Sequence, residues 1–303
     1  MKAKVPEALA GERIDRVVAM LTGLPRSTVA RLVASGEVRV AGRAVGARSR
    51  RLREGEEIDV DVAGAGALHV DVPAPEVEVV VVHADDDVVV VDKAPGMVVH
   101  PGAGNARGTL AQALLARYPE LATVGQAGRG GVVHRLDKGT SGLMVVARSP
   151  HAYDALVAQL GARAVGRRYL ALVWGCPRPP RGRVDAPIGR SRRDPTRMTV
   201  SNQGREARTT YEVHRSFDVP AEAALVACWL ETGRTHQIRV HLAAVGHPVV
   251  GDARYGGRRA PLACPRPFLH AEQLAFDHPS TGERLSFSSA LPPDLDAVLA
   301  QLS

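Results

Sequence analysis

A run of small and bend-forming residues divides the chain early in its length. Residues 63–76, AGAGALHVDVPAPE, are rich in Ala, Gly and Pro and show no helical face. Such a composition favours an extended connection over a packed element. With 303 residues, the chain is long enough for two domains. We therefore predict a small unit at 12–62, a linker at 63–76 and a larger domain at 77–303.

The small unit has the pattern of two short helices followed by strands. Apolar residues recur with helical spacing from Ile14 to Leu21. A second helix is expected from an N-cap at Ser27 to a stop at Gly36. The alternating stretches EVRVAGRAV and EIDVDV that follow predict short strands.

A cluster of arginines lies between these predicted strands. Its members are Arg43, Arg48, Arg50, Arg51 and Arg53. A solvated charged face is the more common origin of such a run, but a basic turn beside two helices also suits phosphate contact. We favour phosphate contact and predict that Arg48, Arg50 and Arg51 bind RNA.

The overall charge is compatible with a polyanionic partner. Lys plus Arg number 39 against 32 Asp plus Glu, which gives a net charge of +7. The prevalence of Ala, Val and Arg is also what a GC-rich coding sequence produces, so the distribution of charge matters more than its total.

Cysteine usage and hydropathy set the expected compartment. Cys176, Cys228 and Cys264 form no Cys-x-x-Cys pair, so we expect neither a disulfide framework nor a cysteine zinc site, and a cytoplasmic location. No apolar run reaches the length of a membrane span, and the first residues lack the apolar core of a secretory signal.

The larger domain mixes strand and helix patterns without regular alternation. Two valine-rich runs around an acidic turn at 83–87 predict a hairpin, and residues 169–174 predict a strand. Helices are expected at 110–118, 152–160 and 235–245. Because strands do not alternate with helices, the pattern favours an α+β fold over a doubly wound sheet.

A second basic segment lies within the larger domain. Residues 178–197 contain seven Arg and two Asp, with Gly and Pro throughout. We interpret the segment as a loop that faces phosphate groups and predict that Arg192 and Arg193 contact RNA.

The densest chemical signal is the stretch GVVHRLDKGTSGLMVVAR at 131–148. Two apolar runs flank its polar centre, and Gly139 and Gly142 allow tight turns there. Asp137 is expected where a strand enters a loop, a usual place for a functional side chain. An Asx-turn, in which Asp137 only binds the amides that follow it, explains the spacing equally well.

A second polar cluster, ETGRTHQIRVH, covers residues 231–241. His236 and His241 are five residues apart, which does not match the spacing of a helical zinc pair. We therefore expect these histidines to be satisfied internally or to contact RNA. The arginines of this cluster, including Arg239, suit a carboxylate or a phosphate.

These segments together resemble the pseudouridine synthases of large ribosomal subunit RNA. The signature is HRLDKGTSG at 134–142, and four further stretches follow in family order: DKAPGMVVHP at 92–101, RYLALVWG at 168–175, GRTHQIRVHLAAVGHPVVGDARYGG at 233–257 and FLHAEQLAFDHPSTGERLSFSSAL at 268–291. Residues 12–62 resemble the S4 RNA-binding module of the D-type branch. The first motif departs from the family pattern Lys-Pro-x-Gly by reading Lys93-Ala94-Pro95-Gly96, which leaves the shape of that loop open.

The resemblance implies a fold and a set of site residues. It implies an S4-like module followed by a catalytic domain on a mixed, mainly antiparallel sheet with flanking helices. Asp137 matches the catalytic carboxylate, and Arg239 matches the arginine that pairs with it and would keep it ionised and oriented. Tyr169 matches the tyrosine that stacks under the target base and is a candidate acceptor of the C5 proton. Arg135 matches the arginine that fills the vacated stack.

The implied reaction converts uridine in RNA to pseudouridine without cofactor, metal or redox change. Asp137 would attack C1′ or remove the C2′ proton. Lys93 and His100 are expected only to shape the pocket or contact the RNA backbone. A stem-loop of large-subunit ribosomal RNA is the expected substrate, and a monomer is the simplest assembly.

Two other functions remain compatible with parts of the pattern. The first is a non-catalytic RNA-binding or ribosome-assembly protein, which would not need Asp137, Tyr169 and Arg239 together. The second is a metal-dependent RNA hydrolase that uses some of the eleven histidines, whose spacing matches no convincing ligand set.

Overall fold

The chain divides into two compact units, Met1–His69 and Val70–Ser303. The computed structural model describes residues 1–303 except 23, 25, 62–71, 103–104, 127 and 195, and only the backbone of 26–28 and 31. Most of the expected linker therefore lies outside the described residues. Its last part belongs to the second unit, because Ala74 is 4% exposed and its amide donates to the carbonyl of Gln112.

The first unit packs two helices on a small antiparallel sheet. The helices are α1 (Ile14–Thr22) and α2 (Arg26–Ala34), after a 3-10 turn at Glu7–Leu9. The sheet has the order β1 (Lys2–Lys4), β4 (Glu57–Val60), β2 (Val38–Val40), β3 (Arg43–Ala44). Since β1 pairs with β4, the unit begins well before the predicted boundary at residue 12.

The helical spacing read from the sequence is confirmed in this unit. Ile14, Val17 and Val18 are fully buried on α1 and share one core with Leu32 of α2 and Ile58 of β4. The predicted cap is wrong, because α2 already begins at Arg26 and Ser27 lies inside the helix.

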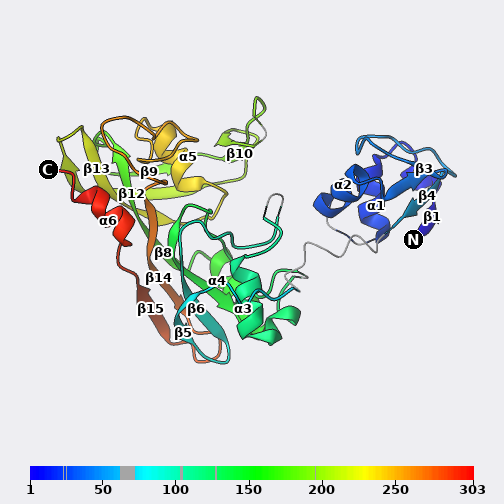
Figure 1. Ribbon diagram of the computed structural model, residues 1–303, viewed down its shortest axis with the longest axis horizontal. Coiled ribbons are helices and arrows are strands. Elements are labelled where there is room, and N and C mark those ends of the chain that lie inside the picture. The colour runs from blue at the N-terminus through cyan, green and yellow to red at the C-terminus, as the bar shows by residue number, and fades with distance from the viewer. Residues whose placement is uncertain (23, 25, 62–71, 103–104, 127, 195) are drawn as a thin grey trace. The chain divides into compact units, whose positions relative to one another are not determined.

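The second unit is built on one large mixed sheet (Figure 1). Its order is β5 (Val80–Ala84), β6 (Val88–Lys93), β7 (Ser141–Ala147), β14 (Leu269–Asp277), β8 (Gly166–Trp174), β13 (Ala223–Leu230), β12 (Arg208–Phe217), β9 (Arg181–Asp185), with β15 (Arg284–Ser288) beside β14. All these pairs are antiparallel except β7 with β14. The α+β class and the mainly antiparallel sheet are confirmed.

Helices cover both faces of this sheet. They are α3 (Leu110–Arg117), α4 (Pro150–Gly161), α5 (Gln237–Ala244) and α6 (Pro293–Leu299), with a 3-10 helix at Pro119–Thr123. Val89 and Val91 of β6 pack in the core that contains α3, whereas Val88 and Val90 pack in the core that contains α4. A strand buried on both faces needs continuous apolar residues, which explains the valine run.

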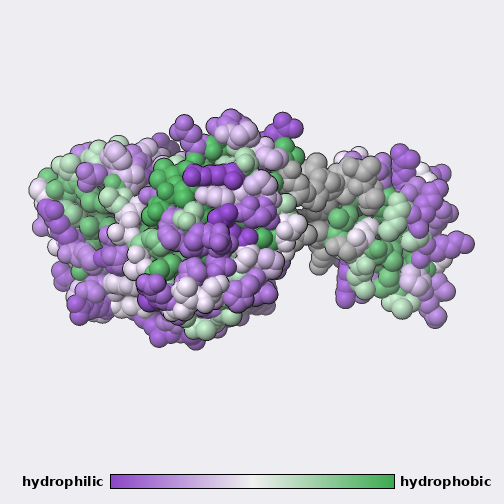
Figure 2. Space-filling model, turned by 90° about the horizontal axis from the view of Figure 1, so that it is seen from below, coloured by the Kyte–Doolittle hydropathy of each residue, from purple (hydrophilic) through white to green (hydrophobic). Residues whose placement is uncertain are grey.

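Polar side chains form the surface seen in Figure 2, with smaller hydrophobic areas between them. This distribution is ordinary for a folded chain with internal cores. No helix in the described part of the chain is long and apolar enough to cross a membrane.

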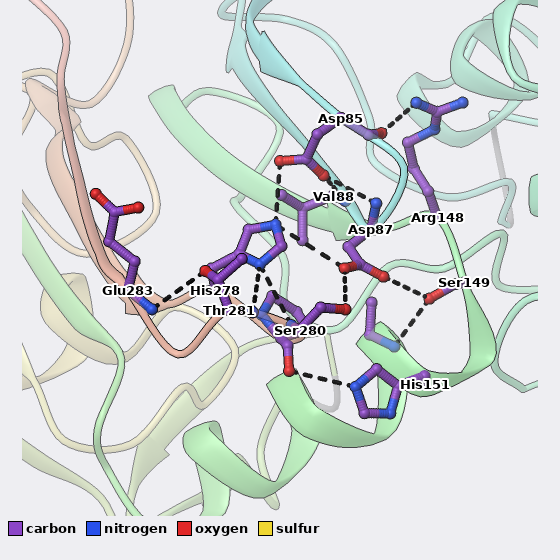
Figure 3. Close-up of polar contacts among 12 residues, drawn as sticks. Asp85, Asp87, Val88, Arg148, Ser149, His151, His278, Ser280, Thr281 and Glu283 are labelled. Atoms are coloured by element: carbon purple, nitrogen blue, oxygen red, sulfur yellow. Dashed lines mark hydrogen bonds and ion pairs between the residues drawn. The ribbon is translucent and has the colours of Figure 1, made fainter.

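A polar cluster ties the β5–β6 turn to α4 and to the β14–β15 turn (Figure 3). Asp85 accepts hydrogen bonds from the amides of Asp87 and Val88, both at 2.8 Å, and lies 3.3 Å from Nε2 of His278. Ser149 caps α4 through the amide of Ala152 and donates to Asp87. Three segments far apart in sequence are thereby joined at one end of the sheet.

The Asp85→Asn variant should lose stability in a pH-dependent way. Burial favours the neutral acid, but hydrogen bonds from the Val88 amide, from His83 and from the Asp87 amide outweigh it and lower the pKa of Asp85. The stabilisation is therefore complete above the pKa of the unfolded chain and disappears as the pH falls through the lowered pKa. Urea unfolding at pH 7 should show a loss of about 1 kcal/mol, which vanishes in strong acid. Exposed Asp86→Asn is the control, and an equal loss in both variants would contradict the assignment.

Candidate active site

The loop that carries Asp137 is fixed by backbone contacts. The amide of Thr140 donates to the carbonyl of Asp137 at 3.0 Å, and the amide of Gly96 donates to the carbonyl of Lys138 at 2.7 Å. Arg266 donates to the carbonyl of Gly139 at 3.0 Å. Asp137 precedes β7 and does not end a strand as predicted, because the residues before it form only the isolated bridge Val132–Val146.

A glycine is required where this loop enters the sheet. Gly142 has φ +112°, and a Cβ there would lie 2.3 Å from the carbonyl oxygen of Ala271. This close approach accompanies the parallel pairing of β7 with β14, in which Gly142 faces Ala271. The tight turn predicted at Gly142 therefore reflects close packing between two strands.

The Asp137 carboxylate is paired with Arg239. Nη1 of Arg239 donates to Oδ2 of Asp137 at 2.9 Å, and Nε2 of His236 lies 4.0 Å from Oδ1. In the described part of the chain, no following amide donates to this carboxylate, so the Asx-turn interpretation is not supported. The side chain of Asp137 keeps 17% of its surface exposed, which leaves it accessible to a substrate.

Arg239 is itself held by a second carboxylate. Its Nε and Nη2 donate to the two oxygens of Asp252 at 2.6 and 2.9 Å, and Asp252 is 1% exposed. Burial alone would lower the pKa of Arg239, but the hydrogen bonds to Asp252 and the charge of Asp137 raise it. The ring of Tyr255 lies 5.1 Å from the guanidinium carbon. Arg239 is therefore a permanently charged, fixed donor.

The local backbone sets up this arrangement. His236 adopts φ +59° immediately before α5, so the helix starts at Gln237, two residues later than predicted. Its Nδ1 lies 2.8 Å from the hydroxyl of Tyr255. His241 is fully buried between Thr209 and the carbonyl of Ala186, which fits the prediction of an internally satisfied histidine.

Tyr169 lies on β8 and is 5% exposed. It borders the same cavity as Asp137, whose volume is ≈ 560 Å³. Burial raises the pKa of Tyr169, although the positive charge of Arg167 opposes the shift. The cavity is basic because five arginines line it: Arg129, Arg135, Arg163, Arg167 and Arg234.

Lys93 and His100, which we expected only to shape the pocket or contact the RNA backbone, both lie near the site. Lys93 is fully buried, and its ammonium donates to the carbonyls of Ala94 and Met97 at 2.8 and 3.0 Å, while burial lowers its pKa to about 8. Lys93 thus holds the first-motif loop together, including its unusual Ala94-Pro95 order. His100 lines the cavity, and burial lowers its pKa to about 4.

Arg135 and its neighbour His134 differ in role. Arg135 is exposed at the cavity, as a residue that contacts RNA would be. His134 accepts a hydrogen bond from the amide of Val145 through Nε2, and burial lowers its pKa to about 3. His134 is therefore a neutral residue that fastens the loop to β7.

The predicted phosphate-contacting arginines of the first unit are only partly free of internal partners. Arg48 is exposed, Arg50 forms an ion pair with Glu56 at 2.9 Å, and Arg51 donates to the carbonyl of Gly11 at 2.7 Å. The last two also support the fold of this unit.

The segment 178–197 is not the loop that we predicted. It contains β9, which pairs with β12, and β10 (Ile188–Arg190), which pairs with β11 (Met198–Val200). Arg192 and Arg193 are exposed between these two short strands, which project from the main sheet in Figure 1. The sequence of β9, RGRVD, does not alternate apolar with polar residues, so hydrophobic spacing does not predict a strand there.

Three important residues were missed from the sequence. Asp252 and Tyr255 lie in the stretch GDARYGG of the third motif but carry no spacing that indicates a partnership with Arg239. Arg266, which holds the Asp137 loop, also pairs with Asp294 at 2.6 Å. Within the described residues, no group of three or more His, Cys, Asp or Glu side chains is arranged to hold a metal ion.

The structure thus places a carboxylate, a fixed guanidinium and an aromatic ring at one basic cavity. The profile of the RNA pseudouridylate synthase family matches residues 87–244. The chain therefore belongs to the RNA pseudouridylate synthase family, and it is an RNA pseudouridine synthase. The resemblance found in its motifs is confirmed.

Relatives agree along nearly the whole chain. An uncharacterized RNA pseudouridine synthase of Chloroflexus aurantiacus is 47% identical, with 98% of this chain and 92% of the relative covered. The ribosomal large subunit pseudouridine synthase D of Xanthomonas campestris is 45% identical, with coverages of 99% and 92%. The solved structure of human RNA pseudouridylate synthase domain containing 1 has a TM-score of 0.57 at 30% identity and covers 75% of this chain and 89% of its own.

The Asp252→Asn variant should lose both stability and activity. Removing one partner of a buried ion pair leaves an uncompensated charge, which costs about 3–5 kcal/mol. Urea unfolding should show this loss, and the single-turnover rate should fall because Arg239 is no longer fixed. The exposed pair Arg181–Glu212 provides the control, since Glu212→Gln should cost under about 1 kcal/mol. Equal effects of the two substitutions would contradict a special role for Asp252.

Proposed function

We propose that this enzyme converts uridine to pseudouridine in large-subunit ribosomal RNA, with Asp137, Tyr169 and Arg239 as its catalytic residues. The observation that carries the proposal is the 2.9 Å pair between Asp137 and Arg239 in the cavity lined by Tyr169. The substrate class is supported by relatives in Xanthomonas campestris and Nitrosomonas europaea that are named ribosomal large subunit pseudouridine synthase D.

The reaction needs one carboxylate at the sugar. The N1–C1′ bond breaks and its electron pair leaves with the uracil, while Asp137 either bonds to C1′ or removes the C2′ proton. The uracil then turns and C5 bonds to C1′, as the Asp137–C1′ bond breaks or as the C2′ proton returns from Asp137. C5 then loses its proton and N1 gains one. Ordinary glycosidases use two carboxyl groups, but here no separate nucleophile is needed because the leaving base returns.

Arg239 and Tyr169 position the reacting groups. Arg239 leaves Asp137 one orientation, since its other two donors are engaged by Asp252. Tyr169 provides a buried ring on which the base can stack. Burial raises the pKa of Tyr169 and thereby disfavours the phenolate that would accept the C5 proton, which supports a stacking role.

The target uridine must leave its helix to reach this cavity, and flipping leaves a gap in the base stack. Arg135 is exposed beside Asp137, so we assign it to that gap. Arg192 and Arg193 lie exposed on the β10–β11 hairpin and are assigned to phosphate groups that position the RNA.

The first unit is proposed to be an S4-like RNA-binding module. Its two helices on a small sheet and its run of arginines support the assignment, with Arg48, Arg50 and Arg51 as phosphate contacts. We also propose that the enzyme acts in the cytoplasm as a monomer. The three free cysteines fit a reducing compartment such as the cytoplasm.

Asp137→Asn should abolish the reaction without weakening RNA binding. Large-subunit RNA with tritium at uracil C5 releases tritium to water only when the new C5–C1′ bond forms. We expect release by the wild type with or without EDTA, and at least a roughly 10³-fold lower rate for the variant. Unchanged RNA affinity in both proteins separates a chemical role from a binding role. Binding without release by the wild type would favour a ribosome-assembly factor, and chelator-sensitive chain cleavage would indicate a hydrolase.

Replacing Arg48, Arg50 and Arg51 with Ala should weaken RNA binding and reduce its salt dependence. Each lost phosphate contact lowers the slope of log affinity against log salt by about 0.7–0.9. Filter binding between low and moderate salt measures the slope, and unfolding curves show whether the lost Glu56 and Gly11 contacts matter. Arg16→Ala is the control in the same unit, since Arg16 of α1 pairs with Glu12, which precedes the helix. Unchanged slopes with lost activity would overturn this division of labour.

A further inference from the structure

Arg167 lies at the active site but takes no part in the pairs described above. It precedes Tyr169 by two residues on β8, so both side chains belong to the same face of the strand. Both line the ≈ 560 Å³ cavity together with Asp137. Arg167 is only 7% exposed.

The guanidinium of Arg167 is buried without a carboxylate partner among the described residues. Nε has no hydrogen-bond partner, and Nη2 reaches only the carbonyl of Leu230, at 3.3 Å. The acidic residues that line the cavity are paired with other arginines: Asp137 with Arg239, and both Glu231 and Glu206 with Arg163. Its neighbour Arg168 differs, because it forms an ion pair with Glu272.

A buried, unpaired charge is costly, and natural proteins rarely retain one without use. Arginine stays protonated in proteins even though burial lowers the pKa of Arg167. It therefore presents free, charged donors to the cavity. Gly233 leaves room for this position, since a Cβ there would lie 3.0 Å from Nη1 of Arg167.

We propose that Arg167 binds the target uracil, donating hydrogen bonds to a carbonyl oxygen, and stabilises the negative charge on the base once the N1–C1′ bond has broken. This inference rests on the proposed function of the site. The electron pair of that bond delocalises over N1 and the carbonyl oxygens, and Arg167 keeps all its protons throughout. Donors fixed where charge develops contribute about 10²–10³ to a rate.

The base is a better partner for Arg167 than an RNA phosphate. Arg167 adjoins the ring of Tyr169, where the base would stack, and it is buried. Phosphate groups stay near solvent, and the exposed arginines Arg129 and Arg135 are available for them at the same cavity. The uracil carbonyl is neutral before the N1–C1′ bond breaks and negative afterwards. Arg167 would therefore bind the base more tightly after bond breaking than before it, which is what catalysis requires.

The Arg167→Met variant tests the inference. Single-turnover tritium release should slow about 10²–10³-fold, while the Kd for RNA should stay within about twofold. The Tm should stay equal or rise, because an uncompensated charge is removed. Arg168→Met is the matched control on the same strand, and it should lower the Tm through the lost Glu272 pair while leaving the rate within about threefold.

A substrate with a better leaving base separates charge stabilisation from other roles. Fluorine at C5 withdraws electrons and stabilises the departing uracil anion. Mass spectrometry of nuclease digests follows glycosidic cleavage of 5-fluorouridine in RNA. The Arg167→Met substitution should slow this cleavage about tenfold less than it slows the cleavage of uridine. Gly233→Ala, which displaces the guanidinium but keeps its charge, should show the same pattern with a smaller loss. It serves as the second variant if Arg167→Met does not fold.

The outcomes distinguish this inference from the proposed function. A near-normal rate for Arg167→Met beside an inactive Asp137→Asn overturns the role of Arg167 alone. An active Asp137→Asn overturns the site assignment and this inference with it. A raised Kd with a smaller salt slope means a phosphate contact, and a lowered Tm with equal losses for uridine and 5-fluorouridine means a structural role. Either result overturns the proposal.

Discussion

The guanidinium of Arg239 is shared between two carboxylates, and the active site depends on that sharing. Asp252 takes two of its donors in a fully buried, two-point contact, which leaves Nη1 for Asp137. A bidentate partner fixes the orientation of a guanidinium as well as its charge. The buried residue Asp252 therefore orients Asp137 through Arg239. Tyr255 covers the guanidinium and in turn holds His236, so the turn before α5 belongs to the same unit. Burying the Arg239–Asp252 pair is tolerable because the two charges match, whereas the second carboxylate, Asp137, keeps 17% of its side chain exposed.

The large sheet brings these residues together from distant parts of the chain. Asp137 lies just before β7, and Tyr169 lies on β8, with β14 between the two strands. The parallel pairing of β7 with β14 brings Gly142 against the backbone of Ala271, which sets where the Asp137 loop ends. Arg266, at the start of the path into β14, then holds Gly139 of that loop. A cavity built on such a rigid base can hold its groups in place before the substrate arrives, which is the main requirement of electrostatic catalysis.

Local patterns predicted much of this architecture, and non-local contacts explain what they missed. The helical spacing of α1 and the valine hairpin of β5 and β6 follow from residues that are near in sequence. The start of α5 was misplaced because His236 takes a left-handed conformation, which hydrophobic spacing does not signal, and its ring contacts Tyr255, 19 residues away in the sequence. Strand β9 was read as a loop because its residues lie at the edge of the sheet, where burial leaves no apolar signature. The motif resemblance supplied Asp137 and Arg239, but the partnership with Asp252 depends on a turn whose geometry no spacing rule gives.

The shape of the Arg239 side chain matters for the reaction beyond its charge. The most direct measurement is the single-turnover rate of tritium release by Arg239→Lys, together with its Kd for RNA. Lysine keeps the positive charge but cannot direct separate fixed donors to Asp252 and Asp137. We predict a loss of at least about 10²-fold in rate at an RNA affinity within about twofold of the wild type. A rate close to that of the wild type would show instead that a positive charge at this position suffices, whatever the shape of the side chain.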